Sequence, residues 1–312
     1  GSRKNLLLNG NFDFWERQVA TGVTVDATIS DLYSADRWKR TSGGPVSKTL
    51  EVQRGEFDVQ TTEGTPEKLE PGNFPKYYIN IKGTATDPLA SNDFVALEQR
   101  IEDYRTLNHK NASLSFYAKG TAVGNFHVGL NRKGSGSQFY NVKEFRIEET
   151  GTWKKYTTNL VVPEVTFGYT NLEDTYLSLM FHTLVKGGER GYVGSADINY
   201  AGTLSIAQVQ LEEGSRVTPF EHLSVAEELP LLQRYYWRDD DLTLSYESFP
   251  DSNGREGIAN PCYFPVTMRT KPATTSVRLG LTTLPAAAEI LTTSKRSATW
   301  KSTDGNDVNN AI

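Results

Sequence analysis

The amino-acid sequence predicts a mainly β protein, in which a β-sandwich is followed by a short connecting helix and a second, smaller β domain. Apolar and polar residues alternate in short runs through the first two-thirds of the chain, and Gly, Pro, Asn and Asp break these runs at the spacing of a sandwich. Helical periodicity first appears near residue 224, and strand-like runs return after residue 237. These observations divide the chain into residues 1–222, 223–237 and 238–312.

Three segments in the first part have the period of two that is typical of a strand buried on one face. They cover residues 112–120, 125–133 and 175–183. Because their alternating patterns agree, we expect them to be strands of sheets that share one core. We also assign three tryptophans to the core, because each lies in a motif next to a strand: Trp15, Trp38 and Trp153. The inward-facing residues are predicted to be Leu114, Phe116, Ala118, Phe126, Val128, Leu130, Leu177, Leu179 and Phe181.

Two irregularities are expected within the sandwich. Residues 131–140 predict a hairpin loop, because the two glycines of this segment adopt a positive φ at low cost. The apolar phase shifts within residues 204–211, which predicts a β-bulge near Ala207 and Gln208.

A helix is predicted to begin at Ser224, because Ser224 and Glu227 have the spacing of a capping box. Pro230 lacks a backbone N–H group and is expected to kink this helix. Apolar residues four, three and four positions apart form one stripe along it, namely Val225, Leu229, Leu232 and Tyr236. This is the spacing of a coiled-coil seam, so the stripe is buried either against identical helices of other chains or on the sandwich of its own chain.

The distal part has weaker signals. Residues 262–272 are its clearest predicted strand, and residues 250–257 are predicted to form a loop. The first two residues, Gly1 and Ser2, resemble a cloning remnant, and the last residues contain no closing element. We therefore expect the chain to be a fragment and the distal domain to be truncated.

Composition excludes several classes of function. A formal net charge of -5 over 312 residues disfavours electrostatic binding to nucleic acid or anionic lipid and favours neutral partners. The single cysteine, Cys262, rules out an internal disulfide framework. No apolar run approaches the roughly 18 residues that cross a bilayer, so we expect no membrane insertion.

No motif predicts catalysis, a metal or a cofactor. The four histidines, His109, His127, His182 and His222, lack the spacing of metal ligands. A nucleophile elbow requires glycines two residues before and two residues after its serine, and neither Ser135 nor Ser137 has both. Residues 251–254 lack the third oxygen ligand of a calcium loop. The acidic residues 239–241 are predicted to lie in a solvent-exposed loop. Glycoside cleavage requires two carboxylates at a defined separation in space, and one sequence does not show that separation. An enzyme that degrades polysaccharide therefore stays open as an alternative.

Several motifs together resemble a known class of protein. They are "NLLLNGNFDFWER" (5–17), "YSADRWK" (33–39), "VALEQRIED" (95–103), "ASLSFYAKG" (112–120), "GTWKKYTTNLVVP" (151–163), and "VQLEEGSRVTPFE" followed by "EELPLLQRYY" (209–236). In this order they resemble the C-terminal region of tailed-bacteriophage tail fibres and related receptor-binding proteins, over about three-quarters of the chain. The β part looks like a jelly-roll carbohydrate-binding module.

The resemblance implies a homotrimer in the virion tail fibre that contacts other tail proteins and recognises a host cell-surface glycan without cleaving it. The alternatives are a polysaccharide-degrading tail enzyme and a purely structural trimerisation module. In the trimer, the apolar stripe of the helix is the oligomer interface. Modules of this kind often hold a structural calcium through an Asp in the final strand; Ala207 and Gln208 stand there instead, so we expect no calcium.

A glycan is bound by aromatic ring faces and by side-chain hydrogen bonds, so the outward positions of the predicted strands are the candidate ligand-binding residues. They are Tyr117, His127, Tyr176 and His182. Tyrosines in or beside loops are alternatives, namely Tyr140, Tyr169, Tyr192 and Tyr200.

Overall fold

A computed structural model describes most of the sandwich and parts of the distal region. The described residues are 3–17, 33–43, 48–58, 69–70, 73–132, 138–162, 164, 175–188, 196–237, 248–250, 256–258, 260–270, 288–293 and 297–302. The chain forms two compact units, Gly1–Leu223 and Ser224–Ile312. Within the described residues, no helix is long and apolar enough to cross a membrane.

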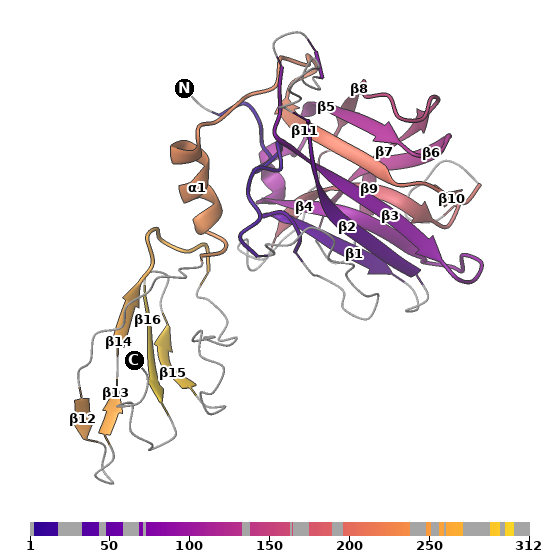
Figure 1. Ribbon diagram of the computed structural model, residues 1–312. Coiled ribbons are helices and arrows are strands. Elements are labelled where there is room, and N and C mark those ends of the chain that lie inside the picture. The colour runs from indigo at the N-terminus through magenta and orange to yellow at the C-terminus, as the bar shows by residue number, and fades with distance from the viewer. Residues whose placement is uncertain are drawn as a thin grey trace. The chain divides into compact units, whose positions relative to one another are not determined.

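The first unit is a jelly-roll β-sandwich made of two antiparallel sheets, which Figure 1 shows packed face to face. The six-stranded sheet has the order β1 (Trp38–Gly43), β4 (Phe94–Glu102), β9 (Tyr176–Val185), β6 (Gly124–Arg132) and β7 (Gln138–Ile147), and β10 (Ile198–Asn199) pairs with β9. The five-stranded sheet has the order β2 (Lys48–Glu56), β3 (Tyr77–Ala85), β11 (Leu204–Glu213), β5 (Asn111–Gly120) and β8 (Lys154–Val161). One 3-10 helix, Tyr104–Leu107, joins β4 to β5. The predicted fold class is therefore confirmed.

The core lies between the two sheets and is centred on aromatic residues. Phe116 of β5 is fully buried, and its ring packs against rings from both sheets, those of Phe126, Phe145, Tyr156 and Phe181, with centroids 5.1 to 6.2 Å apart. All nine predicted inward residues belong to this core. Alternation therefore identified the buried face of β5, β6 and β9 correctly.

The predicted bulge in β11 is present. The register between β11 and β5 shifts between Ala207 and Gln210, and Gln208 has a φ of 49°. The N-terminal segment pairs with the displaced backbone, because the Val209 N–H donates to the Gly10 carbonyl at 2.8 Å and Asn5 Nδ2 donates to the Val209 carbonyl at 3.1 Å. The predicted hairpin is also present, since β6 and β7 pair antiparallel, although its loop residues 133–137 lie outside the described residues.

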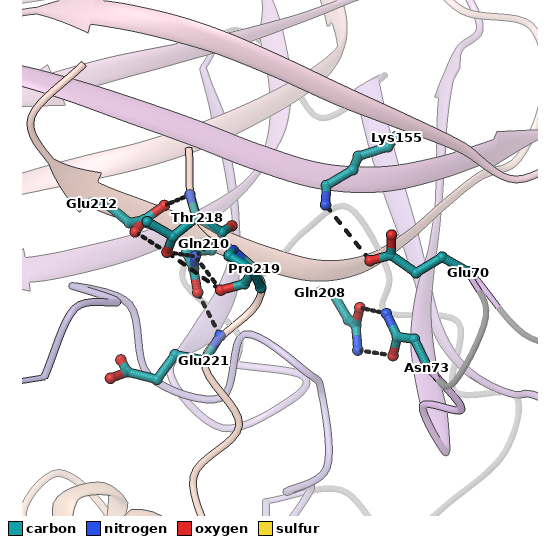
Figure 2. A network of polar contacts seen from close by, with 9 residues as sticks. All are labelled: Glu70, Asn73, Lys155, Gln208, Gln210, Glu212, Thr218, Pro219 and Glu221. Carbon is teal, nitrogen blue, oxygen red and sulfur yellow. Dashed lines mark hydrogen bonds and ion pairs between the residues drawn. The ribbon is translucent and has the colours of Figure 1, made fainter. Parts of the chain in front are cut away.

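After β11, the chain folds back onto the outer face of that strand. Gln210 accepts a hydrogen bond from the Glu221 N–H at 2.7 Å, and Glu212 accepts hydrogen bonds from the N–H and the hydroxyl of Thr218 at 3.0 and 2.6 Å (Figure 2). Ser113 of β5 donates to the Arg216 carbonyl at 3.1 Å. The returning segment therefore covers one end of the five-stranded sheet.

The second unit contains α1 (Val225–Gln233) and short strands. Those strands form a pair, β12 (Ser248–Pro250) with β13 (Glu256–Ile258), and a sheet in the order β14 (Asn260–Tyr263), β16 (Ser297–Ser302) and β15 (Ala288–Thr293). The predicted strand 262–272 is wrong over residues 264–270, which lie outside any strand, and residues 271 and 272 lie outside the described residues. Pro265 donates no ladder hydrogen bond, which disfavours a continuation of the strand, whereas Pro261 is tolerated within β14 because β14 is an edge strand.

The helix begins where the sequence predicts. Ser224 precedes α1, and both its N–H and its hydroxyl donate to Glu227 Oε2, at 2.9 and 2.7 Å. Pro230 lies inside α1, which ends at Gln233. Tyr236, the last residue of the predicted stripe, therefore lies beyond the helix.

Candidate functional site

The outer face of the five-stranded sheet carries a group of aromatic side chains that is separate from the core. We call Phe57, Tyr78, Lys119 and Trp153 the aromatic face. Phe57 follows β2, Tyr78 lies on β3, Lys119 lies on β5, and Trp153 precedes β8. Successive side chains of a strand point to opposite faces of the sheet, so Ile79 and the other inward-facing residues of these strands lie in the core while these side chains lie on the opposite surface.

The three rings contact one another. The Phe57 centroid lies 4.9 Å from that of Tyr78 and 5.1 Å from that of Trp153, and the Tyr78 and Trp153 centroids are 5.2 Å apart. Phe57 is only 3% exposed and forms the base of the cluster, whereas Tyr78 and Trp153 are half-buried. Part of each of these two rings is therefore open to solvent.

A glycine makes room for this arrangement. Gly55 of β2 lies opposite Tyr78 in the β2–β3 register, and a Cβ atom at Gly55 would clash with the Tyr78 ring. The ring therefore lies against the backbone of β2, where a larger residue would displace it. The cost of glycine in a strand, roughly 0.5 to 1 kcal/mol, is consistent with a position that must accommodate a neighbouring ring.

Lys119 places a positive charge over the rings. Its Nζ atom lies 4.8 Å from the Trp153 centroid and 5.4 Å from the Tyr78 centroid. Both distances are within the range in which the negative face of an aromatic ring attracts a cation. The half-buried side chain of Lys119 is therefore attracted to two ring faces at once.

A row of polar side chains crosses the sheet beside the aromatic rings. Gln53, Asn80, Ser205 and Lys119 are aligned on four adjacent strands. Ser205 donates through its hydroxyl to Asn80 Oδ1 at 2.6 Å, and Gln53 Nε2 donates to Glu51 Oε1 at 2.6 Å. These amides and hydroxyls offer hydrogen bonds next to apolar ring surface.

The neighbouring part of the same face is closed. Residues 69–70 and 73 lie over Tyr117, whose side chain is only 4% exposed. Glu70 accepts a hydrogen bond from the Tyr117 hydroxyl and lies 3.7 Å from Lys155 Nζ, while the Asn73 and Gln208 amides bond reciprocally at 2.7 and 2.9 Å (Figure 2). Burial, followed by this hydrogen bond, raises the pKa of Tyr117, and the same hydrogen bond lowers the pKa of Glu70.

The candidate residues predicted from the sequence do not form one site. Tyr117 lies on the outer side of the five-stranded sheet, whereas His127, Tyr176 and His182 lie on the outer side of the six-stranded sheet. His127 and His182 are direct cross-strand neighbours, and Tyr176 is six residues along β9 from His182. The direction of each side chain follows the predicted alternation, but three of the four are buried.

The two histidines illustrate this burial. His182 is 0% exposed, and its ring lies 5.9 Å from that of Phe94. His127 Nε2 is 3.3 Å from Glu144 Oε2, but burial outweighs this carboxylate and lowers the pKa of His127. Tyr176 is half-buried, with the Arg100 guanidinium 4.2 Å from its ring centroid.

Charged and polar residues are buried on the same outer face. Glu98 of β4 lies 3.4 Å from Lys39 Nζ and 3.0 Å from Arg100 Nε, and the Glu98 and Lys39 side chains are nearly inaccessible. On the next row, Ser178 Oγ and Asn131 Oδ1 are buried and have no hydrogen-bond partner among the described residues. Most of this face is therefore inaccessible to a ligand in the structure.

The structure also corrects two sequence-based assignments. Trp15 and Trp38 belong to the core as predicted, but Trp153 belongs to the aromatic face. The alternation of β8 indicates this position, because Trp153 lies two residues before the outward-facing Lys155 and therefore points to the same side of the sheet. Among the alternative tyrosines, Tyr200 is a core residue whose hydroxyl donates to the Ala122 carbonyl at 2.7 Å. The side chain of Tyr140, and all of Tyr169 and Tyr192, lie outside the described residues.

The described residues contain no group of three or more His, Cys, Asp or Glu side chains that could hold a metal ion. At the bulge in β11, where the resemblance raised the question of calcium, the two side-chain amides of Asn73 and Gln208 bond to each other.

Comparisons with known proteins find distant similarities of fold. No family model and no curated protein sequence matches the chain. A putative sugar-binding protein from Bacteroides thetaiotaomicron aligns with 68% of this chain and 100% of its own, at 13% identity and a TM-score of 0.40. A family 11 carbohydrate-binding module from Clostridium thermocellum, solved with a mixed-linked β-1,3-1,4 tetrasaccharide, aligns over 61% and 96%, at 13% identity and a TM-score of 0.33.

A bacteriophage protein is also among the similar structures. The enzymatically active domain of tailspike protein 4 from bacteriophage CBA120 aligns with 67% of this chain and 21% of its own, at 12% identity and a TM-score of 0.34. At these values the likeness is distant, and the assignment of a jelly-roll sandwich rests on the strand order of the protein itself.

Proposed function

We propose that the sandwich binds a glycan through its aromatic face and does not cleave it. The observation that carries this proposal is the half-buried Tyr78 and Trp153 pair beside the amide and hydroxyl groups of Asn80 and Ser205. Sugar rings present C–H surfaces that pack on aromatic faces, and their hydroxyls exchange hydrogen bonds with amides and hydroxyls. The aromatic face offers both kinds of group on one rigid sheet.

The biological role proposed is host attachment by a bacteriophage tail fibre. This role rests on the resemblance of the sequence motifs to tail-fibre receptor-binding regions, and the ligand would then be a glycan of the host cell surface. Of the four residues predicted from the sequence, Tyr117, His127 and His182 are buried, whereas Tyr78 and Trp153 of the aromatic face are half-buried. Tyr176 is the one residue of these four whose side chain is half-buried rather than buried. Its surroundings on the six-stranded sheet are therefore the alternative position for the site.

The proposed assembly is a homotrimer that uses the stripe of α1, in contact with other tail proteins. Val225 is 65% exposed in the single chain, and Leu229 and Tyr236 are half-buried, so a seam of three helices would remove apolar surface from water. Leu232 is only 3% exposed and needs no second chain for its burial. Light scattering tests the trimer: Val225→Asp with Leu229→Asp should give a monomer mass, and a wild-type monomer would contradict the assembly.

A glycan array followed by titration calorimetry tests the binding site. We expect the double variant Tyr78→Ala with Trp153→Ala to lose about 30-fold or more in affinity, because central aromatic contacts often contribute about 2 kcal/mol or more. Tyr176→Ala is the matched control, since it removes a half-buried tyrosine from the other sheet. Loss of binding in Tyr176→Ala and not in the double variant would place the site on the six-stranded sheet.

Incubation of the protein with the glycan that it binds distinguishes binding from cleavage. After long incubation with the bound glycan, the proposal predicts an unchanged chain-length distribution and no new reducing ends. Shortened glycan would contradict the non-enzymatic function and favour a polysaccharide-degrading enzyme.

A further inference from the structure

Away from the aromatic face, a lysine and two aspartates meet at one end of the sandwich. Lys48 begins β2, Asp87 lies in the connection between β3 and β4, and Asp93 directly precedes β4. Lys48 Nζ is 2.5 Å from Asp87 Oδ1 and 3.4 Å from Asp93 Oδ2. Because β2 and β4 belong to different sheets, these three residues connect both layers of the fold.

The lysine and one of the aspartates are buried. Lys48 lies two residues before Leu50 on β2, so its side chain points to the same side of the sheet, toward the core. The Lys48 and Asp93 side chains are 1% and 0% exposed. The hydrogen bond to Asp87 raises the pKa of Lys48, so the resting pair is an ammonium beside a carboxylate. A buried pair of charges contributes little net stability, because both charges have lost their water.

Asp93 is fixed in place by its backbone and by one of its carboxylate oxygens. Its Oδ2 accepts a hydrogen bond from the Ala90 N–H at 2.7 Å, and its own N–H donates to the Ala90 carbonyl at 3.1 Å. Its carbonyl accepts a hydrogen bond from the Lys186 N–H at 3.0 Å. Its Oδ1 is buried and has no hydrogen-bond partner among the described residues. Buried polar atoms are rarely left unpaired, and this oxygen is placed to receive a proton from the adjacent ammonium.

From this arrangement we infer that Lys48 and Asp87 condense to an intramolecular amide and that Asp93 carries the protons. The lone pair of the deprotonated Lys48 Nζ attacks Asp87 Cγ and forms the N–C bond, and the bond from Cγ to one carboxylate oxygen breaks. Asp93 transfers two protons in turn from Nζ to the departing oxygen, which leaves as water. An ammonium and a carboxylate thereby become a neutral amide and one water molecule, and Asp93 returns to its starting state.

The fixed geometry favours this condensation, which is unfavourable between separate molecules in water. Reacting groups that are held in place reach effective concentrations of about 10⁵ to 10⁸ M. The Asp87 side chain is 51% exposed, so the released water has a path to solvent. The amide would tie the start of the edge strand β2 to the connection that leads into the other sheet. Such a cross-link stabilises a fold mainly by restricting the unfolded chain.

A second buried lysine and carboxylate provide an internal control. Lys39 Nζ lies 3.4 Å from Glu98 Oε2, and both side chains are nearly inaccessible. Arg100 Nε also lies 3.0 Å from Glu98 Oε1. The guanidinium stabilises the ionised carboxylate, which resists attack by an amine. We therefore expect Lys39 and Glu98 to remain an ion pair in the same molecule.

Intact-mass spectrometry of the folded and then denatured protein tests the inference. We expect the wild-type mass to fall short of the sequence mass by one water molecule, and a protease digest to contain a branched peptide that joins Lys48 to Asp87. Asp87→Asn should reach the same cross-linked mass, because an asparagine loses ammonia where an aspartate loses water. Lys48→Met and Asp93→Asn should keep their full sequence masses, with circular dichroism confirming that each variant is folded.

Two results would overturn the inference, and neither depends on glycan binding. A wild-type protein with its full sequence mass and no branched peptide would show that Lys48 and Asp87 form an ion pair only. A cross-link that forms equally in Asp93→Asn would remove the role of Asp93 as the proton carrier. A branched peptide at Lys39 in place of Lys48 would contradict the reason given for the difference between the two pairs.

Discussion

The outer faces of the two sheets start from the same sequence pattern and differ in how they are covered. Both faces carry polar and aromatic residues at alternate positions, as one-sided burial requires. On the five-stranded sheet, Tyr78 and Trp153 keep part of their rings open to water. On the six-stranded sheet, the side chains of Glu98 and His182 are almost completely inaccessible. Alternation therefore tells which way a side chain points but does not tell whether another segment covers it.

This difference has energetic consequences. A buried charge must be balanced by a partner, and the loss of one member leaves the other charge uncompensated in a medium of low polarity. Exposed ion pairs contribute little, because water and salt screen them. The six-stranded face should therefore be important mainly for stability, and the open part of the five-stranded face mainly for binding.

The largest expected effect is in the core that both faces share. Phe116→Ala removes a fully buried ring that packs against four others, so the free energy of unfolding should fall by about 3 to 5 kcal/mol. Urea unfolding followed by circular dichroism measures this change. A loss below about 1 kcal/mol would mean that the two sheets do not pack on a common core.

The next prediction compares one ion pair from each face. Glu98→Gln leaves the buried Lys39 without its carboxylate and should cost about 3 kcal/mol or more in unfolding free energy. Glu70→Gln, the matched change on the other sheet, removes the partner of the partly exposed Lys155 and should cost about 1 kcal/mol or less. Equal effects in urea titrations would remove the proposed difference between the faces.

The third prediction concerns pH and the segment that leads into the six-stranded sheet. Burial raises the pKa of Asp36 to about 6 from the ordinary 3.8, despite a hydrogen bond from the Glu16 N–H. The folded protein therefore holds this proton more tightly than the unfolded chain, so the contribution of Asp36 is fully present below pH 3.8. It is lost as the pH rises through 6, by about 3 kcal/mol for a shift of about two units.

Asp36→Asn isolates this contribution. The stability of the variant relative to the wild type should increase between pH 4 and pH 7, as measured by urea unfolding at each pH. A difference that does not change with pH would show that Asp36 titrates near its ordinary value in the folded protein.

A small effect on stability is also expected at Gly55. Gly55→Ala would push the Tyr78 ring away from β2, with a loss of about 1 kcal/mol in unfolding free energy. Glycan affinity should fall more clearly, because the ring would no longer be held beside Trp153. Calorimetric titration of the folded variant provides the measurement, and wild-type affinity would argue against a role for the Tyr78 position.

Much of the fold follows from the sequence for physical reasons. The alternation in residues 112–120, 125–133 and 175–183 predicted the buried faces of three strands, and the phase shift near Gln208 predicted the bulge. The spacing of Ser224 and Glu227 located the start of α1. These features depend on residues close together in the chain, so the local pattern is sufficient to recognise them.

The candidate site was less predictable, because it depends on contacts between distant segments. Tyr117 faces outward as its parity requires, but residues 69, 70 and 73 cover it, and nothing in residues 112–120 indicates this. Phe57, Tyr78 and Trp153 come from segments far apart in the sequence, and one sequence does not reveal that their rings meet on the same face of the sheet. The misassignment of Trp153 to the core has the same origin, since a tryptophan beside a strand can pack on either side of the sheet.

Hydroxyl-radical footprinting with the glycan identified on the array would test most directly which face binds. The central claim predicts that the ligand protects Tyr78 and Trp153 from oxidation, while the modification of Tyr176 on the six-stranded sheet stays at its ligand-free level. Protection of Tyr176 with unchanged oxidation of Tyr78 and Trp153 would contradict the claim and assign binding to the opposite face.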